Sequence, residues 1–187
     1  MRNVFFTSDT HFNHTNIIKY CARPFGSVEE MNREMIARWN SVVGPEDTVY
    51  HLGDFALGKP SEWPAILRQL NGAAKILIRG NHDRSRRHMV EGGLTEVHEK
   101  IEWNGWMLQH HPIETRRKLL CGHIHEKWKR IGSVINVGVD VWNFTPRTID
   151  ELMKAEESPG EYKCRHCGTM LGRLKNNISH REGKCVS

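Results

Sequence analysis

Five short polar clusters in this sequence carry the side chains that proteins use to hold metal ions. They are Asp9-Thr10-His11, Gly53-Asp54, Gly80-Asn81-His82-Asp83, His110-His111 and Gly122-His123-Ile124-His125. Carboxylate, amide and imidazole donors in this mixture suit borderline ions such as Mn, Fe, Ni, Co or Zn better than Ca or Mg alone. Any one cluster could belong to an ordinary loop, but five together predict a metal centre.

The spacing within two of the clusters favours shared ligation. On an extended strand end, Asp9 and His11 would point to the same face, because side chains alternate with a period of two. His123 and His125 have the same spacing. Each pair is therefore expected to hold the same metal centre.

Each cluster follows a short apolar run, and these runs are the elements that must position it. They cover residues 4–6, 49–52, 76–78, 106–108 and 119–121. Interpreted as strands, they would bring every cluster to a carboxyl end, where α/β folds place their chemistry. Glycines at positions 53, 80 and 122 fit this prediction, since a backbone that passes close to an ion needs room.

Helices are predicted between several of these strands. Ser27 and Glu30 have the spacing of a capping box, and apolar residues follow at helical intervals until Gly44-Pro45. A second helix is predicted over 64–70, and a final pair of strands around 134–137 and 139–142. Strands mixed with helices through about residue 150 indicate one α/β domain.

Length and composition limit the remaining possibilities. A chain of 187 residues can bury one full core and little more, and 38% hydrophobic with 26% charged residues is ordinary for a globular protein. The first apolar run is too short for a signal peptide, and no stretch approaches the roughly 20 apolar residues that span a bilayer. The odd number of cysteines fits a reducing compartment. We expect a cytoplasmic protein without membrane contact.

A polar, turn-rich stretch divides the chain towards its C-terminal end. We predict a main domain over residues 1–153, a linker over 154–160 and a zinc-finger-like module over 161–187. The module has the spacing C-x2-C-x12-H-x4-C, formed by Cys164, Cys167, His180 and Cys185. Because so short a segment cannot build an adequate core, one structural Zn ion would supply most of its stability.

The predicted module is basic, with six Lys or Arg residues against two Glu residues. This charge favours contact with nucleic acid, although such modules also bind proteins or simply cap a domain. Nucleic acid is therefore a possible partner of the C-terminal segment.

The order of the five clusters, D-x-H, G-D, G-N-H-D, H and G-H-x-H, resembles the calcineurin-like metallophosphoesterase superfamily over about residues 3 to 145. Residues 9–14 and 136–143 resemble small bacterial and phage members in particular. After Gly53-Asp54 the chain lacks the Asp-Arg-Gly continuation of the Ser/Thr protein phosphatases, which disfavours a protein substrate. The resemblance implies an α/β fold, the four-layer α-β-β-α sandwich, here with a small C-terminal zinc-binding module.

The resemblance also implies two divalent metal ions. The first position would use Asp9, His11, Asp54 and His125. The second would use Asp54, Asn81, His110 and His123. Asp54 would bridge the ions at about 3.5–4 Å, so that a hydroxide shared by both ions attacks phosphorus. His110 is preferred to His111 because the family's ligand usually lies two residues before a proline.

Three residues are expected to act on the substrate or to hold the group that attacks it: Asp54, Asn81 and His82. His82 would protonate the leaving oxygen, a contribution of about 10²–10⁴-fold in rate, and Asn81 would help neutralise charge on the phosphoryl oxygens. Asp83 either orients His82 or caps the following turn. His14, His51 and His111 could support the ligands, but a structural role is expected of each.

The predicted function is metal-dependent hydrolysis of a phosphodiester in a nucleotide, cyclic nucleotide or nucleic acid. A phosphomonoesterase is the alternative within enzymes. An alternative from another class is a nucleic-acid-binding zinc-finger protein with a vestigial metal site. The presence of every expected ligand speaks against that last alternative.

Overall fold

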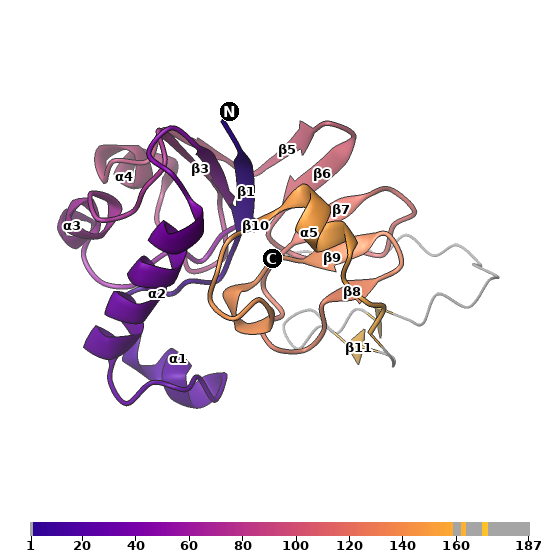
Figure 1. Cartoon of the computed structure of the whole chain (residues 1–187), viewed down its shortest axis with the longest axis horizontal. Coiled ribbons are helices and arrows are strands. Elements are labelled where there is room, and N and C mark those ends of the chain that lie inside the picture. The colour runs from indigo at the N-terminus through magenta and orange to yellow at the C-terminus, as the bar shows by residue number, and fades with distance from the viewer. Residues whose placement is uncertain (1, 159–161, 164–169, 172–187) are drawn as a thin grey trace.

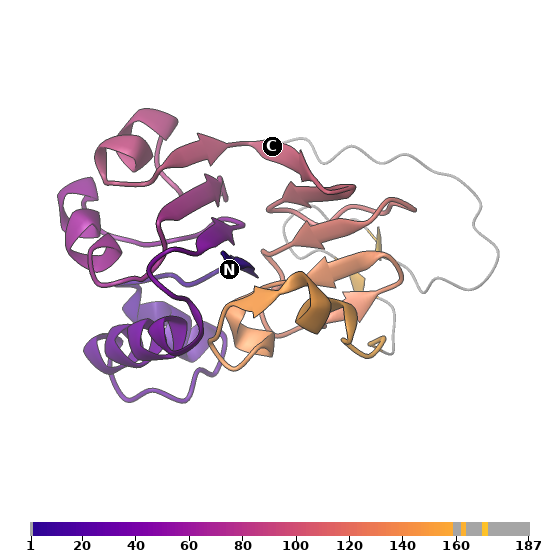
Figure 2. The same cartoon turned by 45° about the horizontal axis from the view of Figure 1, so that its top comes forward.

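Two five-stranded sheets face each other at the centre of the fold (Figures 1 and 2). The computed structural model describes residues 2–158, 162–163 and 170–171. Helices cover the outer face of the first sheet, as Figure 2 shows most plainly. Among the described residues, loop side chains of Ile124 and Trp128 cover the outer face of the second sheet. The mixed α/β architecture is confirmed, whereas the expected second helical layer is not found in this part of the chain.

The first sheet has the strand order β10-β1-β2-β3-β4. Its strands are β1 (Val4–Thr7), β2 (Thr48–His51), β3 (Ala74–Ile78), β4 (Glu96–His98) and β10 (Arg147–Thr148). β1 to β4 run parallel, and Thr7, His51 and Leu77 are aligned across three of them. The loops that follow β1, β2 and β3 therefore leave the sheet side by side.

The second sheet has the strand order β5-β6-β7-β9-β8. Its strands are β5 (Lys100–Trp103), β6 (Trp106–Gln109), β7 (Leu119–Cys121), β8 (Arg130–Ile131) and β9 (Val134–Asn136). β6, β7 and β9 are parallel, with Leu108, Leu120 and Ile135 in register. The loops after β6 and β7 thus also leave from one edge.

The helices pack on the first sheet through one apolar cluster. They are α1 (Thr15–Tyr20), α2 (Val28–Val42), α3 (Trp63–Leu67) and α4 (Arg86–Glu91), while α5 (Ile149–Met153) lies at the edge of the sheet. Met31, Met35 and Trp39 of α2 belong to this cluster, whereas Leu152 of α5 belongs to a second cluster between the sheets. These two buried clusters fix the carboxyl ends of the strands in the two sheets relative to one another.

Most predicted elements are present, with three differences. The helix expected over 64–70 is α3, which continues beyond Leu67 only as turns. The capping box of α2 is half formed, because Ser27 accepts from Glu30 N while the Glu30 carboxylate accepts from Gly26 N. The last expected strand is wrong: Val139–Val141 is a 3₁₀ turn, since Val139 N donates to Ser8 O beside β1.

Residues 153–158 run back over β8. Ser158 N donates to Arg130 O (2.9 Å), and Gly132 N donates to a carboxylate oxygen of Glu157 (3.2 Å). Beyond them the structure describes an antiparallel pair, β11 (Tyr162–Lys163) and β12 (Met170–Leu171). The proposed zinc ligands Cys164, Cys167, His180 and Cys185 lie outside the described residues, so the boundaries of the module stay a prediction. Within the described ranges, no helix is long and apolar enough to cross a bilayer.

Candidate metal centre

The predicted ligands stand on tight loops and not on extended strand ends. Asp9 and His11 have φ angles of 56° and 48°, and His123 and His125 have φ angles of 72° and 47°. The extended strand ends expected for both pairs are therefore wrong. Asp9 and His11 still lie together, beside His125, whereas His123 lies with His110 and His111. Asp54 also has a positive φ of 57°. Such left-handed backbone costs about 1–3 kcal/mol per non-glycine residue and gathers at functional sites.

Hydrogen bonds hold the first of these loops in place. Asp9 N donates to Gly53 O (2.9 Å) and His11 N donates to Asp54 O (3.0 Å), which ties the loop after β1 to the loop after β2. From the other side, the Arg23 guanidinium donates to the backbone oxygens of Asp9 (2.7 Å) and Thr10 (2.9 Å). The strained conformation is thus fixed by its surroundings.

Asp9, His11 and His125 form a first candidate metal position. Their potential ligand atoms all lie within 4.8 Å of one another. Asp9 and His11 are 0% and 1% exposed, and Nε2 of His11 makes no hydrogen bond. A buried imidazole nitrogen without a hydrogen bond beside a buried carboxylate fits a bound cation, because such polar groups are otherwise costly.

Asn81, His110 and His123 lie together at the place predicted for a second metal position. Asn81 Oδ1 lies 3.1 Å from His110 Nε2 and 3.0 Å from His123 Nδ1. His110 is buried, and its Nδ1 donates to Leu52 O (2.7 Å), which turns Nε2 towards Asn81. The preference for His110 over His111 as a metal ligand stays a prediction.

Asp54 lies between the two positions. Its Oδ2 is 3.4 Å from His11 Nε2 on one side and 3.4 Å from His110 Nε2 on the other. Its Oδ1 accepts from His82 N (2.9 Å), so one oxygen holds the loop that carries His82 and the other faces the two imidazoles. Two donors bound to one ion at about 2.0–2.2 Å and 90–109° apart are separated by about 2.8–3.6 Å. The observed spacings of 3.4 Å fall within this range.

The electrostatics of these donors agree with a place for positive charge. Burial raises the pKa of Asp9 and lowers that of His11. Burial alone would raise the pKa of Asp54, but its contacts with His110 and His11 hold it well below its usual range. The same contact with Asp54 outweighs burial at His110 and raises its pKa to about 9. In the metal-free protein, a proton on His110 supplies positive charge that a cation would bring.

A buried ion pair, which the sequence did not reveal, supports His125. Asp140 Oδ2 accepts from His125 Nδ1 (2.9 Å), and Arg23 donates to both Asp140 oxygens (2.8 and 3.0 Å). Burial lowers the pKa of His125, but hydrogen bonds with Asp140 and Cys21 raise it to about 11. Arg23 and Asp140 are 117 residues apart, and no motif links them.

Asp83 has a role that differs from both suggestions made for it. Its carboxylate accepts from the backbone N–H groups of Asp54 (2.8 Å), Phe55 (2.9 Å) and Gly80 (2.8 Å). It therefore fastens the loop after β3 to the loop after β2. The neighbouring His82 is exposed, and its ring centre lies 5.4 Å from that of His11.

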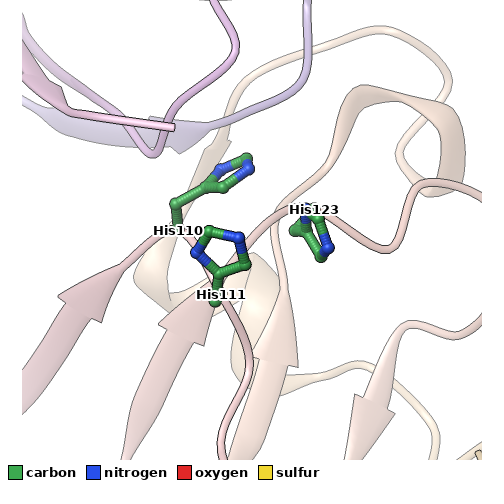
Figure 3. Close-up of side chains that lie close together, drawn as sticks. All are labelled: His110, His111 and His123. Carbon is green, nitrogen blue, oxygen red and sulfur yellow. The ribbon is translucent and has the colours of Figure 1, made fainter. Parts of the chain in front are cut away.

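The three histidines that were expected to have structural roles lie around the donors. His14 Nδ1 is 3.4 Å from His11 Nδ1. Buried His51 contacts Thr10 Oγ1 (2.9 Å) through Nε2. His111 lies with His110 and His123, and Figure 3 shows these three rings close together at the strand ends, with His123 on the neighbouring loop. All eight predicted active-site residues are thus brought to one edge of the two sheets.

A family model for calcineurin-like phosphoesterases matches residues 2–170. The chain belongs to the calcineurin-like phosphoesterase family. It is a metal-dependent hydrolase of phosphoric esters. The family binds divalent metal ions, and this chain contains candidate His and Asp sites for such ions.

Several proteins are similar to this phosphoesterase. An uncharacterized protein of Methanocaldococcus jannaschii is 40% identical over 173 residues, which are 84% of this chain and 93% of that protein. The gene 66 protein of Mycobacterium phage L5 is 36% identical over 85 residues, 44% of this chain and 41% of that protein. A crystal structure of a protein of unknown function from Aquifex aeolicus has a TM-score of 0.65 at 29% identity, covering 82% of this chain and 99% of that one.

Proposed function

We propose that this phosphoesterase is a dinuclear phosphodiesterase that hydrolyses a phosphodiester of a nucleotide, a cyclic nucleotide or a nucleic acid. The observation that carries the two-ion proposal is the position of Asp54. Its Oδ2 lies 3.4 Å from an imidazole nitrogen of each metal position. One carboxylate oxygen so placed can serve two ions, which is the arrangement that two-metal hydrolysis requires.

The chain's own residues supply the remaining parts. When bound, two divalent ions polarise a phosphoryl oxygen and make water a nucleophile near neutral pH. Asn81 directs Oδ1 towards His110 and His123, so its amide N–H groups are left to donate to a phosphoryl oxygen. His82 is exposed beside the donors, with its backbone fixed by Asp54 Oδ1, and can give a proton to the leaving oxygen.

The hydrogen bonds of Arg23 favour a phosphodiester substrate over a phosphomonoester. Its guanidinium is buried and donates to Asp140 and to the backbone oxygens of Asp9 and Thr10. It is therefore not available to bind phosphate. A diester carries one negative charge and a monoester about two near neutral pH, so a diester needs less positive charge from the protein.

The test compares bis-p-nitrophenyl phosphate with p-nitrophenyl phosphate on the full chain with added Mn²⁺. We expect a higher kcat/KM for the diester. Asp54→Asn keeps an acceptor for His82 N but cannot bridge two ions, so it should lose at least about 10²-fold in kcat. A higher kcat/KM for the monoester would replace the diesterase assignment by a phosphomonoesterase.

The C-terminal segment remains a separate proposal. We propose that Cys164, Cys167, His180 and Cys185 bind one structural Zn ion and that the basic module contacts nucleic acid. Replacing Cys164 and Cys167 by Ser should remove about one zinc ion per chain and leave turnover of the small diester in place. Full zinc content in that variant would contradict the proposed ligands.

A further inference from the structure

His111 lies beside two ligands of the second metal position. Potential ligand atoms of His110, His111 and His123 are all within 4.8 Å of one another. The ring centre of His111 is 4.3 Å from that of His123 and 4.9 Å from that of His110, while His110 and His123 are 5.2 Å apart. Figure 3 shows the three rings gathered at one place.

These separations are those of imidazoles around one ion. With a metal–nitrogen bond of about 2.1 Å, a ring centre lies about 3.2 Å from the ion. Two rings at 90° then have centres about 4.5 Å apart, and two rings at 109° have centres about 5.2 Å apart. The three measured separations are close to these values, so the rings can occupy three neighbouring corners of a single coordination sphere.

The backbone around His111 is fixed in this arrangement. The Gln109 side chain donates to His111 O, and Pro112 follows directly. Gly122 N donates to His110 O (2.9 Å), which ties the loop after β6 to the loop that carries His123. Neighbouring residues on a regular strand would point to opposite faces, whereas His110 and His111 both lie near His123.

We propose that His111 is a further ligand of the second metal position, where it completes a three-histidine face with His110 and His123. This inference rests on the proposed two-ion site. The first position then has two imidazoles and two carboxylates, and the second has three imidazoles, one amide and the shared carboxylate. Because imidazole suits Zn, Co and Ni whereas carboxylate suits Mn and Mg, His111 makes the second position selective for the former ions.

The test is titration of the metal-free full chain with Co²⁺ and with Mn²⁺. Binding is measured by calorimetry and, for Co²⁺, also by its visible absorption. His111→Phe keeps a ring against His123 and removes both nitrogens, and His111→Asn serves as a second, smaller variant. His88→Asn, at an exposed position of α4, is the matched control. Thiolate-bound Co²⁺ in the C-terminal segment absorbs in the near ultraviolet, so it is distinguished from Co²⁺ bound by histidine.

We expect both His111 variants to lower the affinity for Co²⁺ at one active-site position by at least about 10- to 100-fold. Losing a ligand should reduce metal affinity more than losing a residue that only hydrogen-bonds to a ligand. The affinity for Mn²⁺ should fall by less than about threefold, and the other active-site position should bind both ions as in the wild type. Co²⁺ affinity unchanged at both positions, or equal loss of Co²⁺ and Mn²⁺, would overturn the inference. Since the measurement needs no turnover, it stands or fails independently of the substrate assignment.

Discussion

His125 donates from Nδ1 to Asp140 Oδ2 over 2.9 Å, and this contact decides which nitrogen of His125 faces the first metal position. A carboxylate only accepts, so Nδ1 carries the hydrogen and Nε2 is left for a cation. Asp140 is itself held by two hydrogen bonds from Arg23, at 2.8 and 3.0 Å. The guanidinium thus orients an imidazole that it does not contact.

Replacing Asp140 by Asn should weaken binding at the first metal position. The amide would no longer impose one tautomer on His125, and a partner of this kind is typically worth about 10- to 100-fold in metal affinity. Calorimetric titration of metal-free protein with Mn²⁺ measures the effect. Asp150→Asn, an exposed carboxylate at the start of α5, should bind Mn²⁺ as the wild type does. Equal affinity in the two variants would refute this role for Asp140.

Gly122→Ala should also weaken the first metal position, because the added methyl group would displace Asp9. A Cβ at Gly122 would meet Ser8 Oγ and would lie 2.5 Å from Asp9 Oδ2. Asp9 is fully buried and accepts from His123 N at 3.0 Å through both oxygens, so it has little room to move.

We expect Gly122→Ala to cost about 1–3 kcal/mol of unfolding free energy and to reduce the metal content of the purified protein. Urea unfolding and elemental analysis report the two effects. Gly26→Ala is the control, because its Cβ would approach only the flexible end of the Glu30 side chain at 3.1 Å. Wild-type stability and metal content in Gly122→Ala would contradict the prediction, because the loop would then have moved to accommodate the methyl group.

The gathering of the ligands was predictable from sequence because parallel strands end at one edge. Thr7, His51 and Leu77 are in register across the first sheet, and the polar clusters follow each of them by a few residues. An apolar run followed by a polar cluster therefore contained the essential spatial information. Leu108 and Leu120 play the same part in the second sheet.

The support of the site was not predictable, because its parts are distant in sequence and have no pattern. Arg23 in a loop has the appearance of a surface residue, yet it is 4% exposed. The left-handed backbone of Asp9 and His11 also escapes a rule based on strand alternation, since that rule assumes extended residues. Tertiary hydrogen bonds, and not local preference, select those conformations.

His82→Ala should have an effect that depends on the leaving group. His82 is exposed beside His11 and is proposed to protonate the leaving oxygen. An alkoxide needs that proton, whereas p-nitrophenolate leaves readily without it. We expect kcat to fall by about 10²–10⁴-fold for an alkyl diester and by clearly less for bis-p-nitrophenyl phosphate. The same loss on both substrates would assign His82 to substrate binding and not to proton transfer.

His51 should make the metal-free protein sensitive to mild acid. Burial lowers its pKa from 6.5 to about 3. Its side chain is buried, with Nε2 against Thr10 Oγ1 and Nδ1 without a hydrogen bond, so the charged form has no stabilising partner at Nδ1. Between these two pKa values the unfolded chain binds a proton that the folded chain does not. The stabilisation is therefore complete above about pH 6.5 and is lost as the pH falls towards 3.

From pH 7 to pH 5 this group alone should reduce the unfolding free energy by about 2 kcal/mol. Urea unfolding in the presence of a chelator, at both pH values, measures the difference for the wild type and for His51→Gln, which keeps an N–H for Thr10 but cannot titrate. Subtracting the two differences removes the contribution of every other histidine. His88→Gln, on the exposed side of α4, should retain the wild-type difference. If His51→Gln loses as much stability in acid as the wild type, His51 is not the group that titrates.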